Sequence, residues 1–180
     1  RGIPLGPVRV KSTCASQEHG TTVTFWPDRE IFKDCCFHPG TLMQHMQETA
    51  FLMSGLTITL YNRSASRDQD SHCDAPVWRF CYQDGLKDFV RSINGPEPTL
   101  YQDILYGQSR TDEVLAEFAL IHNTGFDEKL RSFANNISTP EGGTHVTGFR
   151  QALTRAINDH ARKQGMLKES DPSISREELS

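Results

Sequence analysis

The 180-residue sequence has no long apolar run, no excess of positive charge and no segment typical of a targeting signal. No apolar run approaches the roughly 20 residues that a membrane span needs, and the first residues lack the apolar core of a signal peptide. The 19 basic and 23 acidic side chains leave a net charge of -4, so no overall positive field would hold a polyanion. We therefore predict a cytoplasmic chain without a membrane partner, and stand-alone nucleic-acid binding is disfavoured.

The sequence also lacks the paired C-x-x-C spacing that structural zinc sites use. Its five cysteines are an odd number, and the adjacent Cys35 and Cys36 cannot easily bridge to each other. Cys35, Cys36 and His38 carry the ligand types that zinc prefers, but without the spacing they do not favour a metal site. We predict reduced thiols and no bound metal.

Three regular elements are predicted in the first third of the chain. Residues 21–25 are β-branched and aromatic, which favours a strand, and Pro27 ends it. Residues 41–53 carry apolar side chains at helical spacing and predict an amphipathic helix, whereas residues 56–60 alternate in the manner of a strand. The polar stretch 62–76 has little to bury and predicts a loop or a linker between domains.

The middle of the chain is predicted to hold a strand, a helix and a hairpin. Residues 77–82 favour a strand, and Asp84 is the expected N-cap of a helix that ends near Gly95. Two further strands are predicted near 104–108 and 114–122, and their spacing favours pairing as a hairpin.

The last part of the chain is predicted to end in a long helix. A strand is expected at about 130–137, followed by a turn at Gly142 and Gly143. Thr144 is the expected cap of a helix that reaches about Gln164. The apolar stripe of this helix consists of Val146, Phe149, Leu153, Ile157 and His160. Strands and helices in this order predict an α+β fold.

Two stretches of sequence resemble a known family. Residues 132–158, which include the phrase Gly-Gly-Thr-His and the start of the long helix, resemble the transducer region of the gyrase B family, the ATPase subunits of bacterial DNA gyrase. Residues 20–28 are similar to a late strand of the ATPase domain that precedes that region. The phrase at 81–86 is also similar to some B-type subunits of topoisomerase IV, the paralogue of gyrase.

The resemblance implies a domain organisation. Residues 1–62 would be the C-terminal strands and helix of a GHKL-type ATPase domain, and residues 63–76 a linker. Residues 77–180 would form a transducer domain, incomplete at its C-terminus, with the left-handed βαβ crossover of that family.

The resemblance also implies site residues. Thr21 matches the threonine whose hydroxyl helps to recognise adenine, and Val23 matches an apolar wall of the adenine pocket; from composition alone, Thr21 is an ordinary strand residue. Arg150, Arg155 and Arg162 are candidates for facing DNA, although a solvated helix face is the default interpretation of such a pattern. No catalytic residue is expected in the chain.

The function implied is that of an interior segment of the gyrase B protein, coupling ATP binding and hydrolysis to DNA strand passage and negative supercoiling. The intact protein would use ATP and Mg²⁺, pair with gyrase A in an A2B2 assembly, and contact a second gyrase B on ATP binding, with double-stranded DNA as its substrate. The family's glutamate and asparagine helix and its glycine-rich lid have no match here. The chain alone should therefore bind no cofactor and hydrolyse nothing.

Two alternatives remain open. The chain could be the corresponding segment of a topoisomerase IV B-type subunit. It could also be a non-enzymatic scaffold or nucleic-acid-binding module of the same fold.

Overall fold

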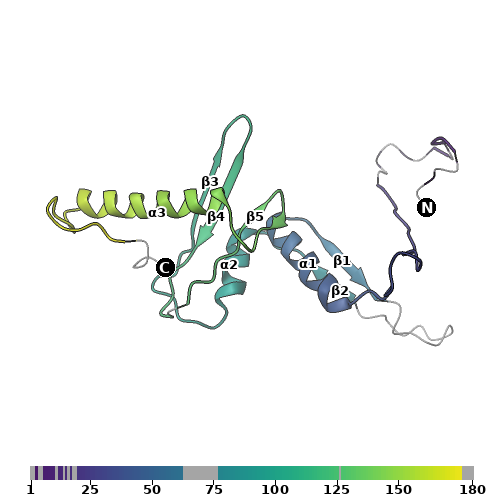
Figure 1. The fold of residues 1–180 in the computed structure, drawn as a ribbon, viewed down its shortest axis with the longest axis horizontal. Helices are drawn as coiled ribbons and strands as arrows, with labels where there is room; N and C mark the ends of the chain where they lie inside the picture. Colours follow the sequence, from purple (N-terminus) through teal and green to yellow (C-terminus); the bar gives the residue numbers. More distant parts are fainter. Residues whose placement is uncertain are drawn as a thin grey trace. The chain divides into compact units, whose positions relative to one another are not determined.

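The computed structural model describes residues 20–62, 77–125 and 127–175, together with positions 3, 6–10, 12, 13, 15 and 17 (Figure 1). The predicted linker at 63–76 lies outside the described residues. The chain divides into two compact units, residues 1–37 and 38–180. The domain boundaries predicted from the sequence stay a prediction.

The first unit contains an extended segment where a strand was predicted. Residues 20–27 are assigned neither helix nor strand, so the strand predicted at 21–25 is wrong. A strand exists only where its backbone pairs with a neighbour, and no described residue pairs with this segment. After it, the N–H groups of Ile31 and Phe32 donate to the Asp28 carbonyl at 3.1 and 2.8 Å and form a turn.

The second unit begins with a helix packed on a hairpin. Helix α1 spans Pro39–Leu52, which confirms the predicted helix, and a proline in its first turn suits the unpaired N–H groups there. Strands β1 (Ile58–Tyr61) and β2 (Val77–Phe80) pair antiparallel, with Ile58 opposite Phe80. Helix α1 lies beside both strands and contacts them (Figure 1). It buries Ala50 and Phe51.

Helix α2 spans Leu86–Asn94 and begins one residue later than the prediction of Asp84 as its cap implied. Its N-cap is Gly85, so the prediction of Asp84 as the cap is wrong. The Asp84 carboxylate accepts a hydrogen bond from Arg91 at 3.1 Å instead of capping the helix, and the Asp84 N–H donates to the Asp88 carboxylate at 3.0 Å. Gly95, with a φ of 64°, ends the helix as predicted.

The predicted hairpin at the centre of this unit is confirmed. Strands β3 (Leu105–Arg110) and β4 (Leu115–Leu120) pair antiparallel, with Gly107 opposite Phe118. Successive residues of a strand face opposite sides, so Tyr106 and Gly107 define its two faces. On one face the Lys87 ammonium of α2 lies 5.1 Å from the centre of the Tyr106 ring.

Helix α3 spans Thr144–Lys163, close to the predicted helix, but its cap is Gly143 rather than Thr144. Thr144 is already the first helical residue, and no side chain caps this end. Phe149 of α3 meets Phe118 of β4 with 5.2 Å between ring centres. The hairpin therefore contacts α2 on one face and α3 on the other.

The inward face of α3 is rotated from the predicted stripe. Its buried residues are Asn158 and Ala161. The predicted members Val146, Phe149, Leu153 and Ile157 are half-buried, and His160 is exposed. A polar residue lies at the centre of this face because its amide is fully hydrogen-bonded there, which the apolar periodicity does not reveal.

The single strand predicted at 130–137 is wrong, because two short strands lie in and beside this range. Strands β5 (Phe133–Ala134) and β6 (Ile137–Ser138) form a tight antiparallel hairpin. Asn135 and Asn136 between them have φ angles of 49° and 65°. Positive φ at both central residues is typical of the type I′ turn, which asparagine tolerates.

The mixed composition of helices and strands confirms the α+β class. Every strand pair within the described residues is antiparallel, and the left-handed βαβ crossover, which joins parallel strands, stays a prediction. Within the same part of the chain, each helix is too short or too polar to cross a bilayer.

Three cysteines are described. Cys35, Cys36 and Cys81 all carry free thiols, in agreement with the predicted reduced state, whereas Cys14 and Cys73 lie outside the described residues. A hydrogen bond with Asp34 and the negative charge of that carboxylate raise the pKa of the Cys36 thiol. Cys36 is therefore a weaker nucleophile than an ordinary surface cysteine at neutral pH.

Candidate functional site

Thr21 and Val23, predicted to recognise adenine, lie in the extended segment of the first unit. Both are exposed, with 79% of Val23 open to solvent. Because Thr21 is exposed, its hydroxyl can both donate and accept a hydrogen bond. Their nucleotide role stays a prediction.

The three arginines predicted to face DNA have three different environments along α3. Arg150 donates to both carboxylate oxygens of Glu128 at 2.6 and 2.5 Å, and only 22% of its side chain is exposed. Arg155 is 85% exposed, with Asp159 at 3.7 Å. Arg162 donates to the Lys168 carbonyl at 2.8 Å. Contact with DNA stays a prediction for all three, and Arg155 presents the most accessible guanidinium.

An aromatic stack joins the end of α1 to α2. The Phe51 ring lies 3.7 Å from Tyr82 and 4.8 Å from Phe89, centre to centre, in stacked geometry. Phe89 in turn lies 5.8 Å from Phe133 on β5. Phe51 is 3% exposed and Phe89 9%, so these two rings are the largest side chains among the buried residues of the described chain. Each such pair contributes about 0.5–1.5 kcal/mol beyond the burial of its area.

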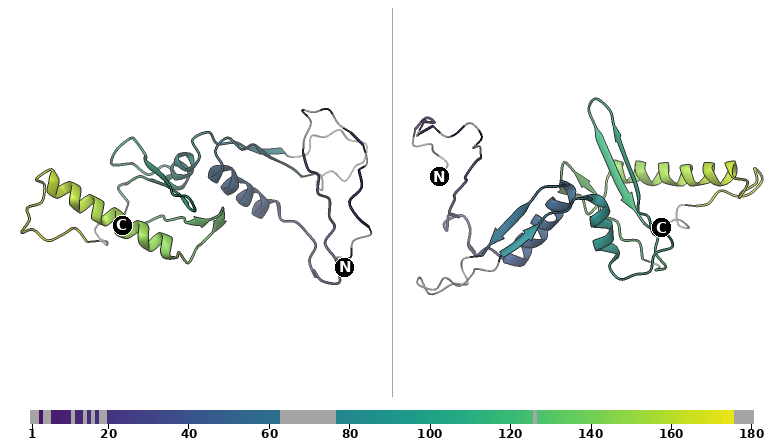
Figure 2. Two further views of the ribbon diagram at one scale, coloured as in Figure 1. Left: turned by 90° about the horizontal axis from the view of Figure 1, so that it is seen from above. Right: turned by 180° about the vertical axis from the view of Figure 1, so that it is seen from behind.

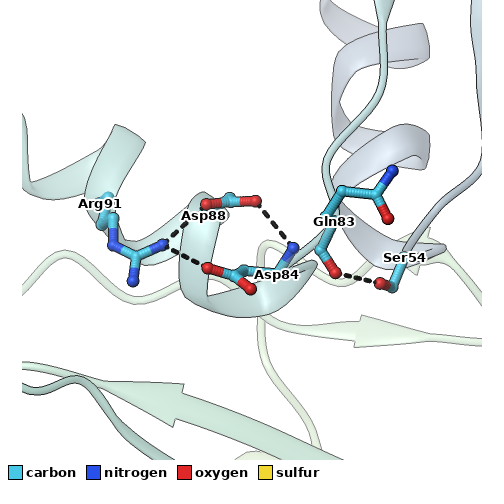
Figure 3. Close-up of polar contacts among 5 residues, drawn as sticks. All are labelled: Ser54, Gln83, Asp84, Asp88 and Arg91. Atoms are coloured by element: carbon cyan, nitrogen blue, oxygen red, sulfur yellow. Dashed lines mark hydrogen bonds and ion pairs between the residues drawn. The ribbon is translucent and has the colours of Figure 1, made fainter.

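Backbone and side-chain hydrogen bonds reinforce this contact. The Gly55 N–H donates to the Tyr82 carbonyl at 3.0 Å, and the Ser54 hydroxyl donates to the Gln83 carbonyl (Figure 3). The Gln47 amide donates to the Tyr82 hydroxyl at 2.9 Å. The turn that follows β2 is thus fixed to the end of α1 at three points.

Gly85 makes this close approach possible. Its φ is 54°, a conformation that residues with a side chain rarely adopt. A Cβ at this position would lie 3.3 Å from Cβ of Ser54 and 3.4 Å from the Phe51 carbonyl oxygen. Glycine therefore lets α2 start directly against the end of α1.

A bracket of charges holds the first turn of α2. Arg91 donates to Asp84 at 3.1 Å and to Asp88 at 2.8 Å, while Asp88 accepts the Asp84 N–H (Figure 3). The hydrogen bond to Asp84, followed by that to Asp88 and the charges of both, raises the pKa of the Arg91 guanidinium.

The residues that connect the two helices are named the α1–α2 joint: Phe51, Ser54, Tyr82, Gln83, Gly85 and Phe89.

A second joint links the β5–β6 hairpin to the start of α3. The Ser132 and Thr139 hydroxyls lie 2.7 Å apart, and Thr139 Oγ1 lies 3.2 Å from Nε2 of His145. The Thr139 N–H also donates to the Ser132 carbonyl at 2.8 Å. These three side chains include no carboxylate, so they do not form a charge-relay triad, and their contacts serve to fix the helix start.

Sequence reasoning did not identify the α1–α2 joint, because its residues come from two segments separated by the stretch 63–76. One signal was available. Gly85 follows Gln83 and Asp84 at a predicted strand end, where a glycine at a helix start indicates a close backbone approach.

A family model described as DNA gyrase B matches residues 85–180. The chain belongs to the DNA gyrase B family. The match begins at Gly85 in the α1–α2 joint and includes α2, the β3–β4 and β5–β6 hairpins and α3.

Individual relatives extend the likeness across most of the chain. It is 41% identical over 165 residues to the DNA gyrase B protein of Clostridium acetobutylicum, a match that covers 91% of this chain and 24% of that protein. It is 34% identical to the B-type subunit of DNA topoisomerase 4 from Streptococcus pneumoniae, covering 96% of this chain and 25% of the relative. This gyrase B family chain thus spans about a quarter of the length of these relatives.

A solved structure also resembles the fold. The 43K ATPase domain of Thermus thermophilus gyrase B, determined in complex with an aminocoumarin, superposes with a TM-score of 0.71 at 30% identity. The match covers 85% of this chain and 39% of that one. The predicted resemblance to the gyrase B family is confirmed.

Proposed function

We propose that this chain is the coupling segment of a B-type subunit of a type II topoisomerase, which transmits ATP-driven closure of one part of the subunit to the part that controls DNA. The observation that supports this most is the α1–α2 joint. In the predicted organisation, α1 belongs to the ATPase side and α2 to the transducer side. A joint with two buried stacked rings and three hydrogen bonds moves both helices together rather than allowing them to hinge.

The partners follow from the same proposal. The intact gyrase B protein pairs with gyrase A in an A2B2 assembly, contacts a second gyrase B on ATP binding, and acts on double-stranded DNA in the cytoplasm. ATP supplies the differential binding energy that favours the closed state, and Mg²⁺ neutralises its phosphates.

Thr21 and Val23 are the residues of this chain proposed to meet the adenine. The chemistry of the pair fits, because a hydroxyl that both donates and accepts suits the adenine edge, and an accessible valine suits the ring face. Two residues of one extended segment make only one wall of a pocket. The chain alone should therefore bind ATP weakly or not at all and should not hydrolyse it.

On the DNA side, Arg155 is proposed to contact phosphate directly. Its guanidinium is the most exposed of the three predicted arginines, whereas Arg150 already holds Glu128. Arg162 already donates to the backbone of the segment after α3. Loss of Arg155 should weaken DNA binding in a salt-dependent manner, and loss of Arg150 should chiefly lower stability.

A second candidate function is that of a topoisomerase IV B-type subunit. The 34% identity to the Streptococcus pneumoniae relative favours it. The two candidates differ in product. Gyrase introduces negative supercoils, whereas topoisomerase IV separates linked circles.

A chimera tests the proposal. The aligned stretch of the Clostridium acetobutylicum gyrase B protein is replaced by this chain, and the purified chimera is combined with the gyrase A protein of the same organism. We expect ATP-dependent supercoiling by the chimera; efficient decatenation without supercoiling would favour the second candidate. A folded chimera that binds ATP but changes DNA topology in neither assay would contradict both.

The joint itself is tested in the same chimera. Phe51→Leu keeps an apolar side chain but removes both stacked pairs, a loss of about 1–3 kcal/mol, and should lower supercoiling per ATP hydrolysed roughly tenfold. Met53→Leu is the matched control, because Met53 is 45% exposed at the end of the same helix. Equal coupling in the two variants would show that the joint does not transmit the closure.

A further inference from the structure

After α3 the chain turns back and runs alongside the helix it has just left (Figure 2). Gly165, with a φ of 71°, makes the reversal. Its N–H donates to the Arg162 carbonyl at 3.0 Å, and the Met166 N–H donates to the Ala161 carbonyl at 2.8 Å. These two bonds form the Schellman motif that commonly ends a helix. We name residues 166–174 the strap.

Asn158 binds the far end of the strap through its backbone. Its Nδ2 donates to the Ile174 carbonyl at 3.0 Å, and its Oδ1 accepts the Ile174 N–H at 2.8 Å. The same Nδ2 donates to the Thr154 carbonyl at 2.9 Å. Asn158 is 7% exposed, so the amide is both buried and fully used. It pairs with Ile174 as the backbone of an antiparallel strand would.

Arg162, one turn further along α3, binds the middle of the strap. It donates to the Lys168 carbonyl at 2.8 Å, to the Asp171 carbonyl at 3.4 Å and to the Ser173 hydroxyl at 2.9 Å. The strap is also braced internally, because the Asp171 carboxylate accepts the Lys168 N–H at 2.8 Å. Asn158 and Arg162 thus anchor the strap to α3 at two separate places.

Apolar packing contributes less to holding the strap. A groove of about 520 Å³ remains between strap and helix, lined by Ala156, Ile157, His160, Ala161, Met166, Leu167 and Ile174. Met166 is 75% exposed, and Leu167 and Ile174 are only half-buried. A segment with few buried apolar contacts and a small number of hydrogen bonds has a low free energy of local opening.

We propose that the strap opens and closes on α3 as one unit and that the Asn158 amide is its latch. Closed, it fixes the direction in which the chain leaves α3 and covers part of the apolar groove. Open, it exposes Ile157 and Ala161. Arg162 guides the strap into place, and Asn158, which binds its last backbone pair, holds it closed.

Two matched substitutions at neighbouring positions test the latch, with hydrogen–deuterium exchange of this chain as the measurement. Asn158→Asp keeps the size of the side chain and its acceptor but replaces the donor with a carboxylate oxygen facing the Ile174 carbonyl. Protection of the strap amides should fall at least about tenfold at pH 7, the factor that corresponds to 1.4 kcal/mol. Asp159→Asn, the reverse exchange at an exposed neighbouring position, should leave strap protection unchanged.

Acid should reverse the effect of the first variant. A protonated carboxyl regains one O–H donor, so strap protection in Asn158→Asp should return near pH 4, around the ordinary pKa of aspartic acid, toward that of the unaltered chain measured at the same pH. The comparison is made at one pH because acid also acts on the Asp171 carboxylate that braces the strap. Recovery by acid distinguishes a lost donor from general damage to the helix.

Three outcomes would overturn the proposal. Unchanged strap protection in Asn158→Asp would show that the amide is no latch. An equal loss of protection across α3 and the β3–β4 hairpin would show that the strap is not a separate unit. If Asn158→Asp does not fold, Arg162→Gln, at a partly exposed position, serves instead, and strap protection equal to that of the unaltered chain would contradict the proposal. Each of these three outcomes would contradict the latch whether or not the chain acts in a topoisomerase.

Discussion

At the residue scale, position 107 requires glycine because a neighbouring ring occupies the space of a side chain, not because of its backbone conformation. It lies opposite Phe118 in the β3–β4 hairpin, and a Cβ added to it would lie 2.4 Å from Cε1 of that phenylalanine. The ring covers the glycine and also contacts the ring of Phe149 on α3. The absence of one side chain therefore lets the hairpin approach the helix.

Gly107→Ala should lower the free energy of unfolding by about 1 kcal/mol, the lower end of the cost of overpacking, because the Phe118 ring, which is 39% exposed, must leave its position. Chemical denaturation of the chain measures this. Gly148→Ala is the control, since a Cβ at this helical position would have no atom within 4 Å apart from its chain neighbours and the backbone of its own helix. That control should gain about 0.5–1 kcal/mol from helix propensity. Equal effects of the two substitutions would mean that the ring does not pack on Gly107.

Tyr106 makes stability depend on pH at the alkaline end. Its hydroxyl donates to Glu117 at 2.7 Å, and this bond, with burial and the charge of Glu117, raises the pKa of the phenol above its ordinary value of 10.0. A raised pKa in the folded state stabilises the fold below pH 10 and loses that contribution as the pH rises through the raised value.

Absorbance titration at 295 nm should therefore show Tyr106 ionising at a higher pH than a tyrosine without a carboxylate partner. Glu117→Gln removes the charge and should bring its pKa back toward the ordinary value. A titration curve that is the same in both proteins would show that the Tyr106–Glu117 bond does not form in solution.

At the element scale, the β5–β6 hairpin depends on its two asparagines. Both adopt positive φ, the conformation that a type I′ turn requires and that alanine resists. The hairpin carries Phe133 to the aromatic stack and Thr139 to His145. A short turn thus positions contacts to both α2 and α3.

Asn136→Ala should cost about 1 kcal/mol, the lower end of the penalty for a side chain in the left-handed region. Asn136→Gly should change stability by less than about 0.5 kcal/mol, because glycine tolerates this φ. Thermal unfolding of both variants measures the difference. If alanine and glycine behave alike, the turn is not type I′ in solution.

At the scale of the whole molecule, the stability of the second unit should not depend on the first. The buried apolar residues of the described chain are Ala50, Phe51, Phe89 and Ala161, and all lie in residues 38–180. Helix α1 begins at Pro39 with His38 as its N-cap, directly at the division between the units.

Removal of residues 1–37 should therefore shift the midpoint of thermal unfolding by less than about 2 °C, which corresponds to under 1 kcal/mol for a domain of this size. Calorimetry of the two chains tests this. A shift several times larger would show that residues 1–37 contribute to the core of the second unit.

The sequence was sufficient for the elements whose signals are local. The helical spacing at 41–53 predicted α1, and the turn at Gly95 predicted the end of α2. The alternating strands at the centre of the chain predicted the β3–β4 hairpin. The amino-acid sequence of residues 132–158 identified the family. These features depend on neighbours within a few residues, so the sequence carries them directly.

Tertiary structure decided the rest. Residues 21–25 have strand propensity but no paired neighbour among the described residues, and Asn158 occupies an apolar face because its amide meets the backbone of Ile174. The α1–α2 joint brings Phe51 onto Tyr82 and Phe89. By itself the sequence determined the helices, the central hairpin, the α+β class and the family. Only the fold decided which residues form the joint, the latch and the buried face, because each depends on partners distant in the chain.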